Sequence, residues 1–400
     1  MSMMPSSDSS HSENLGCIQN CKAIKSAAIY GANAAGKSTM IQAFVAAIMA
    51  VRLSDTRNIT QKIPNMIPFK FDETTANSPC SFEFYFVADN QKRYRYGFTA
   101  DSTRIHEEYL YYYASSRPSR IFERTGDQFE FNQIDKPEFS EFEQKNTSNK
   151  LFLATATNWG SPKTAPAYQW LADAIDVYLS EMNNPAILQF YENDEKNELK
   201  QFALSLFRQA DINISDFQIE ITNLGETQET MGITNFQGKA ISQSHLKAVT
   251  IRTGHQVKCS DGSKQNFYLD LREESQGTNQ LFWIAPILKE VIGKGKTMVI
   301  DELDRSLHPF LVKFLVELFH NPVLNKKNAQ LIFTTHDTTL LSLDTFRRDQ
   351  IYFVEKDPHT AATELYSLDE FSVRKSENIE KGYLLGRYGA VPYVHPEGEL

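Results

Sequence analysis

Apolar residues along this chain alternate between short uninterrupted runs and a three-to-four-residue periodicity. Short runs of this kind are typical of buried strands, and they form the apolar centres of the segments 27–30, 296–300, 330–335 and 351–354. The periodic spacing is typical of amphipathic helices, and it occurs at 40–51, 198–207 and 279–291. Buried strands that alternate with amphipathic helices predict an α/β fold.

A different pattern, alternation of apolar and polar residues, covers the region from about 66 to 132. The segments 81–86, 93–98 and 108–113 predict antiparallel strands joined by short turns, one of them at Asp89-Asn90. Their alternating aromatic residues could also form a stacking platform for single-stranded nucleic acid. We favour the core side of a sheet, because aromatic residues at this period belong far more often to sheet packing.

Residues from about 160 to 212 have a helical pattern, with one amphipathic segment opening near 167 and another at 198–207. The pattern contains no sustained heptads, so it predicts a compact helical insertion and not a long coiled coil. We hypothesise that the insertion, 163–210, together with weaker strands over 216–258, is the surface that recognises a partner or a trigger.

The most specific chemical motif lies between the first predicted strand and the helix at 40–51. Residues 31–38 spell Gly-Ala-Asn-Ala-Ala-Gly-Lys-Ser, a complete G-x-x-x-x-G-K-S phosphate loop in a strand–loop–helix context. Its glycines let backbone N–H groups point at a phosphate, and the helix N-terminus adds partial positive charge. Lys37 would bind the β- and γ-phosphates, and the Ser38 hydroxyl would bind Mg²⁺. The residues expected to bind the nucleotide are Gly31, Asn33, Ala34, Ala35, Gly36, Lys37, Ser38 and Thr39.

Two adjacent acids follow the predicted strand at 296–300. Asp301 is expected to hold Mg²⁺ at the strand end. Glu302 stands one residue further on, where a carboxylate beside the γ-phosphate but off the metal can accept a proton from the attacking water. The sequence therefore predicts an ATPase that uses ATP and Mg²⁺.

Three further segments define the class of ATPase. They are Glu274-Ser275-Gln276-Gly277-Thr278 before a helix, Leu303-Asp304-Arg305 after the two acids, and His336-Asp337 after the strand at 330–335. Together with the phosphate loop and the acids, their order resembles that of the ATP-binding-cassette (ABC) ATPases: phosphate loop, S-x-G signature, Walker B with a catalytic Glu, D-loop and H-switch. The resemblance implies an ABC-type P-loop ATPase head with an antiparallel β-subdomain.

In an ABC-type head, the γ-phosphate on one phosphate loop stays half exposed until a second subunit covers it. The resemblance therefore implies that Ser275, the Gly277 backbone and the following helix N-terminus cap ATP bound to a partner copy. Asp304 would reach across the dimer seam, and the assembly would be a homodimer or a higher homo-oligomer held by ATP. His336 would contact the γ-phosphate or the attacking water. The implied catalytic residues are Glu302, His336 and Lys37.

Over nearly its whole length, the chain resembles stand-alone ABC-type ATPases of phage defence, the RloA and AbiL-type abortive-infection proteins related to the OLD family. Residues 25–38, 274–278, 299–309, 333–337 and 382–392 carry this resemblance. It implies a sensor or motor subunit that controls a separate effector protein, a nuclease, in answer to a phage protein trigger. Residues 149–158 are similar to the approach to the family's Q-loop. Asn158 stands where Gln is usual there, which implies a contact to the metal through its bound water.

One other class of function shares every one of these motifs. A DNA-repair or chromosome-associated ATPase of the RecF or SMC kind would also be expected to have a basic surface or long coiled coils. The formal net charge of −9 argues against a strong, sequence-blind nucleic-acid binder, and contact with nucleic acid stays open. A GTPase would need an N-K-x-D segment, which does not occur at a suitable place after the phosphate loop.

Composition predicts a cytoplasmic protein without a membrane partner, because no apolar run is long enough to span a bilayer. The four cysteines have neither zinc-binding spacing nor the density of a disulfide framework. We therefore expect free thiols at Cys17, Cys21, Cys80 and Cys259.

Five regions are predicted along the chain. The Ser-rich opening predicts a disordered polar arm over 1–24, in place of the edge strand with which the family usually begins. The two halves of the ATPase head would occupy 25–159 and 259–356. The helical insertion with its connecting strands would lie between them, at 160–258, and a C-terminal tail would follow at 357–400.

Overall fold

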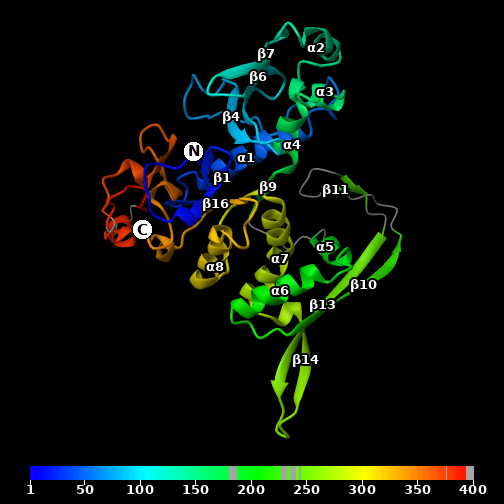
Figure 1. The fold of residues 1–400 in the computed structure, drawn as a ribbon, viewed down its shortest axis with the longest axis vertical. Coiled ribbons are helices and arrows are strands. Elements are labelled where there is room, and N and C mark those ends of the chain that lie inside the picture. Colours follow the sequence, from blue (N-terminus) through cyan, green and yellow to red (C-terminus); the bar gives the residue numbers. More distant parts are fainter. Residues whose placement is uncertain (180–186, 227–231, 235–239, 243–244, 375, 393–400) are drawn as a thin grey trace, which may run out of the picture.

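The computed structural model of the chain describes residues 1–179, 187–226, 232–234, 240–242, 245–374 and 376–392. Its centre is a six-stranded sheet in which all neighbouring strands are parallel except one antiparallel strand at an edge (Figure 1). In spatial order the strands are β18 (Thr363–Ser367), β17 (Ile351–Lys356), β3 (Ser26–Gly31), β16 (Gln330–Thr334), β15 (Thr297–Ile300) and β9 (Ile175–Tyr178). The strands predicted from the four apolar runs are confirmed, and they lie in one sheet.

Helices cover both faces of this sheet, as buried parallel strands require. Along β3, Ile29 packs into the core beneath α1, whereas Ala28 packs into the core formed with α7 and α8. Figure 1 shows α1 and α4 on one side of the sheet and α7 and α8 on the other. This arrangement confirms the predicted α/β fold class. The described α-helices are α1 (Lys37–Arg52), α2 (Lys136–Glu143), α3 (Phe152–Asn158), α4 (Ala165–Asp173), α5 (Leu188–Glu192), α6 (Glu198–Gln209), α7 (Gln276–Lys294), α8 (Pro309–His320) and α9 (Ile379–Leu384).

A separate five-stranded antiparallel sheet lies over α1, as the alternating pattern predicts. Tyr96 and Phe98 are buried in its core, as expected of the core side of a sheet, whereas Tyr85 of the same sheet is 62% exposed. The buried carboxylate of Glu108 accepts hydrogen bonds from the N–H groups of Phe152 at 2.6 Å and Leu153 at 2.9 Å, which ties the start of α3 to the sheet. The strands are β4 (Cys80–Val87), β5 (Arg93–Ala100), β6 (Ile105–Tyr113), β7 (Pro118–Thr125) and β8 (Gln128–Phe131).

The region predicted as a helical insertion, 160–258, is only partly one. Helix α6 packs on α7 as an added layer, but α4 packs on α1 and β9 is a strand of the central sheet. The apolar pattern does not predict β9, because Asp176 interrupts its short apolar run. In the fold, Asp176 is neutralised by Lys296, whose ammonium donates to it at 3.0 Å.

A three-stranded antiparallel sheet follows α6, and its last two strands form the long hairpin that projects from the body in Figure 1. The predicted boundary at 259 is wrong, because it falls inside this hairpin. The strands are β10 (Asp216–Glu226), β13 (His245–Lys258) and β14 (Lys264–Asp270), with a small two-stranded sheet of β11 (Gly232–Thr234) and β12 (Ala240–Ser242) between the first two in sequence.

The C-terminal segment is part of the head and not a separate tail. β18 pairs with β17 along the edge of the central sheet. Tyr383 of α9 and Tyr388, which follows that helix, stack on Phe353 of β17, with ring centroids 5.5 and 5.7 Å away. The predicted boundary at 357 therefore divides one packed unit, because the glycine-rich sequence of 382–392 folds back onto the sheet.

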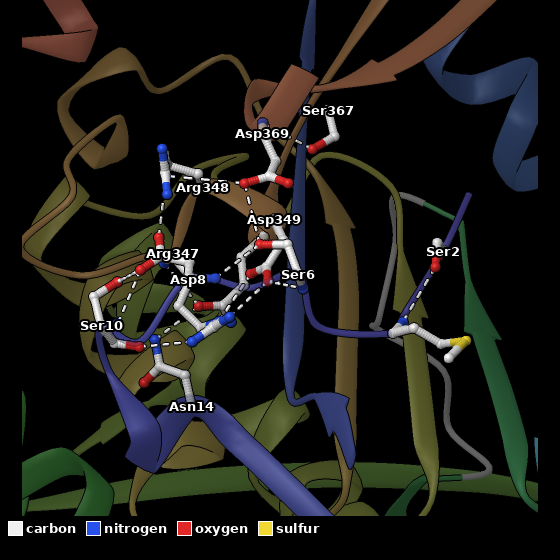
Figure 2. A network of polar contacts seen from close by, with 12 residues as sticks. Ser2, Ser6, Asp8, Ser10, Asn14, Arg347, Arg348, Asp349, Ser367 and Asp369 are labelled. Atoms are coloured by element: carbon white, nitrogen blue, oxygen red, sulfur yellow. Dashed lines mark hydrogen bonds and ion pairs between the residues drawn. The ribbon is translucent and has the colours of Figure 1, made fainter. Parts of the chain in front are cut away.

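The N-terminal arm is ordered, which corrects the expectation of a disordered segment. Figure 2 shows its polar groups joined to the residues before β17. The Arg347 guanidinium, buried and paired with Asp349 at 2.7 Å, donates to the Ser10 carbonyl at 2.7 Å. The Ser6 N–H donates to Asp349 at 2.7 Å. Composition alone does not reveal this order, because the partners lie 337 and 343 residues away in the chain.

Beyond the arm, a 3₁₀ turn, η1 (Ser12–Asn14), leads into a hairpin of β1 (Leu15–Ile18) and β2 (Cys21–Ile24). Asn14 donates to the Gln350 side-chain oxygen at 2.8 Å. The Gln350 amide donates to the Ser26 hydroxyl at 2.8 Å, and that hydroxyl lies 2.7 Å from His320 Nε2. A buried polar network thus joins the arm to the first residue of β3 and to the end of α8.

This network makes the fold acid-sensitive. Burial lowers the pKa of His320 from its ordinary 6.5 to about 3. Between these two pH values, His320 is protonated in the unfolded chain and neutral in the folded chain. The contribution of neutral His320 to the free energy of unfolding is present above pH 6.5 and is lost as the pH falls from 6.5 toward 3. At pH 5 the loss should be about 2 kcal/mol. Urea unfolding at pH 7 and pH 5 measures the loss.

The matched variants are His320→Gln and His359→Gln, the second at an exposed histidine. His320→Gln should remove most of the difference between the two pH values, whereas His359→Gln should leave it unchanged. An equal pH difference in His320→Gln would contradict the assignment.

The four cysteine thiols, all within the described ranges, are free. Among the described residues, every helix is too short or too polar to cross a lipid bilayer.

Candidate functional site

The phosphate loop lies at the carboxyl end of β3, immediately before α1. Gly36 has a left-handed backbone with φ of 111°, which side chains disfavour. A Cβ on Gly31 would lie 2.4 Å from the Val354 carbonyl oxygen, so a side chain there would force β3 and β17 apart. The exposed residues of the loop and of the first helical turn are Asn33, Ala34, Ser38 and Thr39.

The loop also rests on a residue that sequence analysis did not single out. Thr363, at the start of β18, donates its hydroxyl to the Ala35 carbonyl at 2.9 Å. A Cβ on Gly36 would lie 2.4 Å from the same hydroxyl. The turn of the loop is therefore packed directly on the C-terminal part of the chain.

Lys37 is the loop's buried cation, with 6% of its surface exposed. Its ammonium donates to the carbonyl oxygens of Gly31 at 2.6 Å and Ala32 at 3.1 Å. Burial lowers the pKa of Lys37, and the carboxylates of the segment after β15 oppose that shift. Within the described ranges Lys37 forms no ion pair, so the centre holds a desolvated positive charge that suits an anion.

Asp301 and Glu302 come directly after β15, and one residue of β16 holds both. The Thr334 hydroxyl donates to Asp301 Oδ1 at 2.6 Å and accepts the Glu302 N–H at 2.7 Å. Glu302 has φ of 52°, a left-handed conformation that is uncommon for a residue with a side chain and often marks a functional site. The two predicted acids therefore have a fixed backbone at the edge of the sheet that also carries the phosphate loop.

Asp304 forms a hydrogen bond within its own chain, and its reach across a dimer seam stays a prediction. Its Oδ2 accepts a hydrogen bond from the His336 N–H at 3.1 Å. Its Oδ1 is buried without a protein partner among the described residues. Asp304 thus connects the segment after β15 to the segment after β16, where the His336 side chain is exposed.

Two more buried polar atoms near this edge have no protein partner in the described part of the chain, Tyr30 Oη and Asp337 Oδ2. Tyr30 is 1% exposed and immediately precedes the phosphate loop. Burial, and then the charge of Asp337, raise the pKa of Tyr30 well above its usual range. Buried polar atoms thus lie at the carboxyl ends of β3 and β16, the end of the sheet at which open α/β folds bind their ligands.

Ser275 caps the N-terminus of α7, where its hydroxyl accepts the Thr278 N–H at 3.1 Å. It is exposed, and no hydrogen bond joins it to the phosphate loop within the described residues. The preceding Glu274 accepts from His255 Nε2 at 2.7 Å, which attaches this segment to β13. A Cβ on Gly277 would meet nothing closer than 3.7 Å. The predicted signature is an open helix N-terminus.

Asn158 is not brought to the predicted metal residues by any contact in the described part of the chain. Its helix α3 begins beside Ser54, past the C-terminal end of α1, with the Leu151 N–H donating to the Ser54 hydroxyl at 2.7 Å. Ser38 lies at the opposite end of α1. The metal role of Asn158 stays a prediction that this geometry does not support.

The donors at the site suit ATP with Mg²⁺. The buried Lys37 ammonium lacks an anionic partner among the described residues, and the phosphates would supply one. The Ser38 hydroxyl and the Asp301 carboxylate are the hard oxygen ligands that Mg²⁺ prefers. In the described ranges, no group of three or more His, Cys, Asp or Glu side chains is placed to hold a metal alone. The ion would therefore depend on nucleotide phosphates for part of its coordination.

A family model matches most of the chain. A family model described as "AAA domain, putative AbiEii toxin, Type IV TA system" matches residues 26–342. No curated protein matches the sequence. One similar solved structure is titled a crystal structure of the SmcHead bound to the C-winged helix domain of ScpA, with 12% identity and a TM-score of 0.37 over 86% of this chain and 91% of that one.

Another similar structure is titled an Smc head domain with an extended coiled coil bound to the C-terminal domain of ScpA, derived from Pyrococcus furiosus. It has 12% identity and a TM-score of 0.38, over 87% of this chain and 92% of that one. At such identities and scores, neither likeness bears on function.

Proposed function

The chain belongs to the AAA-domain family whose description names AbiEii toxins and type IV toxin–antitoxin systems, and from this premise we propose that it binds and hydrolyses ATP. The observation that carries the proposal is the state of Lys37. Its buried ammonium sits at the mouth of a complete phosphate loop, held by two carbonyl oxygens and by no carboxylate of the described chain. Such a charge favours a phosphate as its partner.

Each remaining residue has a proposed part in hydrolysis. The loop N–H groups and Lys37 bind the phosphates, while Ser38 and Asp301 hold the metal. When bound, Mg²⁺ neutralises charge that develops on the phosphate oxygens. Glu302 accepts the proton of the attacking water. His336, exposed at the end of β16, contacts the γ-phosphate or that water.

We propose that two copies of the chain complete each site, with Ser275 and the N-terminus of α7 covering ATP on the partner's phosphate loop. In support, Ser275 is exposed and, among the described residues, forms no hydrogen bond to the phosphate loop of its own chain. The segment after Asp304 is its neighbour, because Gly277 lies beside the Ser306 carbonyl. Phe310, which follows that segment, is 77% exposed.

For the biological role, we propose a cytoplasmic sensor or motor subunit of a phage-defence system. It controls a separate effector, a nuclease, in answer to a phage protein. The family description and the resemblance of the motifs support this role. The bond between Glu274 and His255 offers a physical route, because movement of the β13–β14 hairpin would reach Ser275. Co-purification with the products of neighbouring genes, in ATP and in ADP, tests the partner directly.

Phosphate release measured over a range of protein concentrations tests the ATPase proposal. Turnover per chain should rise with concentration, because a complete site needs two chains. Turnover that is independent of concentration, in a protein that sediments as a monomer, would contradict the paired site. Strong stimulation by duplex DNA would favour the alternative of a DNA-repair ATPase.

A further inference from the structure

Thr334 is a polar residue that follows three apolar residues at the end of β16, and it is completely buried. β16 places it between β3, which leads into the phosphate loop, and β15, which leads into Asp301. A threonine hydroxyl has one hydrogen to donate and two lone pairs to accept. Here it donates to Asp301 Oδ1 at 2.6 Å and accepts the Glu302 N–H at 2.7 Å.

The first bond fixes the carboxylate of Asp301. Because Oδ1 is held by the Thr334 hydroxyl, rotation of the carboxylate is restricted. Hydrogen-bond partners that orient a metal ligand in this way set both its geometry and its basicity. The bond therefore acts on the residue proposed to hold Mg²⁺.

The second bond fixes the backbone on which the proposed base is carried. Glu302 has a left-handed φ of 52°, which is unfavourable for glutamate and persists only where the surroundings enforce it. Its N–H is held by the Thr334 hydroxyl, and the next N–H, of Leu303, donates to the Thr334 carbonyl at 3.1 Å. The turn that aims Glu302 is thus bonded to one residue of the neighbouring strand.

We infer that Thr334 is a positioning residue of the ATPase centre, whose single hydroxyl sets the metal-binding carboxylate and the base together. The inference deepens the proposed function and rests on it. Thr334 does not touch the nucleotide, because it is buried beneath the two acids. Thr334 affects metal binding and proton transfer, and it does not affect the binding of the phosphates by Lys37.

Thr334→Val tests this, because valine keeps the shape of threonine and lacks the hydroxyl. Binding of a fluorescent ATP analogue is measured with EDTA and then over a Mg²⁺ titration, and ATP turnover is measured over the same titration. We expect the half-saturating Mg²⁺ concentration to rise and kcat to fall, each by about 10- to 100-fold, while metal-free binding stays within about twofold.

Two further variants are the controls. Thr334→Ser keeps the hydroxyl and should restore Mg²⁺ affinity and kcat to within about threefold of wild type. Thr297→Val removes a hydroxyl from β15 at its amino end, far along the strand from Asp301. It should change neither the Mg²⁺ affinity nor kcat. If Thr334→Val fails to fold, Thr334→Cys replaces the hydroxyl by a thiol, which is a weaker hydrogen-bond donor. The Mg²⁺ affinity and kcat of Thr334→Cys should be lower than those of Thr334→Ser and wild type, but still measurable.

An unchanged Mg²⁺ dependence in folded Thr334→Val would overturn the inference. So would a serine variant as defective as the valine variant, or a loss of metal-free binding equal to the loss of turnover. Failure of the proposed function looks different, because wild type would then bind no ATP or release no phosphate. If wild type binds Mg²⁺ and ATP without turnover, the Mg²⁺ titration of binding alone decides the inference.

Discussion

Lys37→Met is expected to weaken ATP binding by about 100-fold, because a charge-assisted contact to phosphate contributes up to about 3 kcal/mol. The folded protein should be no less stable than wild type. Burial lowers the pKa of Lys37, which means that the folded protein holds this charge at a cost, and methionine removes the charge while keeping the apolar stem. Isothermal titration with ATP and urea unfolding without it measure the two quantities.

The control for this substitution is Lys62→Met, at an exposed lysine, which should change neither ATP affinity nor stability. A Lys37→Met protein that binds ATP as wild type does would remove the observation on which the proposed function depends. A variant that unfolds more easily and binds ATP normally would make Lys37 a structural residue.

Glu302→Gln is expected to lower ATP turnover by about 10²- to 10⁴-fold, because the amide cannot accept the proton of the attacking water. Glutamine has the length of glutamate and the same preference against φ of 52°, so the turn held by Thr334 should persist. ATP should still bind, and the uncleaved nucleotide should hold two chains together. Single-turnover hydrolysis and sedimentation velocity with ATP measure these effects.

Glu195→Gln, at an exposed glutamate, provides the comparison and should turn over ATP at the wild-type rate. Rapid turnover by Glu302→Gln would mean that another group takes the proton. A variant that hydrolyses slowly but stays monomeric with ATP would separate the base from the proposed dimer.

Local patterns were sufficient for the parts of the fold that sequence encodes locally. The apolar runs within 27–30 and 296–300 identify strands because three consecutive apolar residues or more are buried on both faces of the sheet. The strand β9 escapes the same test because Asp176 interrupts it, and its neutralising partner Lys296 lies 120 residues later. A pattern of apolar residues contains no information on such a pair.

The candidate site divides in the same way. Gly36, Lys37 and Asp301 are recognisable because their chemistry is written in consecutive residues. Thr334 and Thr363 are not, since each acts through a partner on a distant segment: the acids after β15 in one case and the phosphate loop in the other. The one signal for Thr334 in the sequence is a polar residue directly after the apolar residues 331–333.

The arm shows how a composition rule fails. Serine-rich sequence predicts disorder because it buries little apolar surface. Here, the backbone of Ser6 and Ser10 is held by the buried Arg347–Asp349 pair, and the Asn14 side chain joins the network beneath β3. Order in this segment comes from specific polar partners, which only the folded chain supplies.

A mixing experiment tests most directly whether Lys37 and the signature of two different chains form one site. Lys37→Met disables the phosphate loop. Gly277→Asp places a carboxylate at the N-terminus of α7, where there is room for a side chain and where it would repel phosphate. Gly293→Asp, at an exposed glycine of the same helix, is the control for the added charge.

Each inactive variant alone should release almost no phosphate. In an equal mixture, about half of the dimers should be mixed and have one complete site, which restores about a quarter of the wild-type rate. A mixture that is no more active than its two components, although the chains exchange, would show that each chain hydrolyses ATP without the signature of its partner.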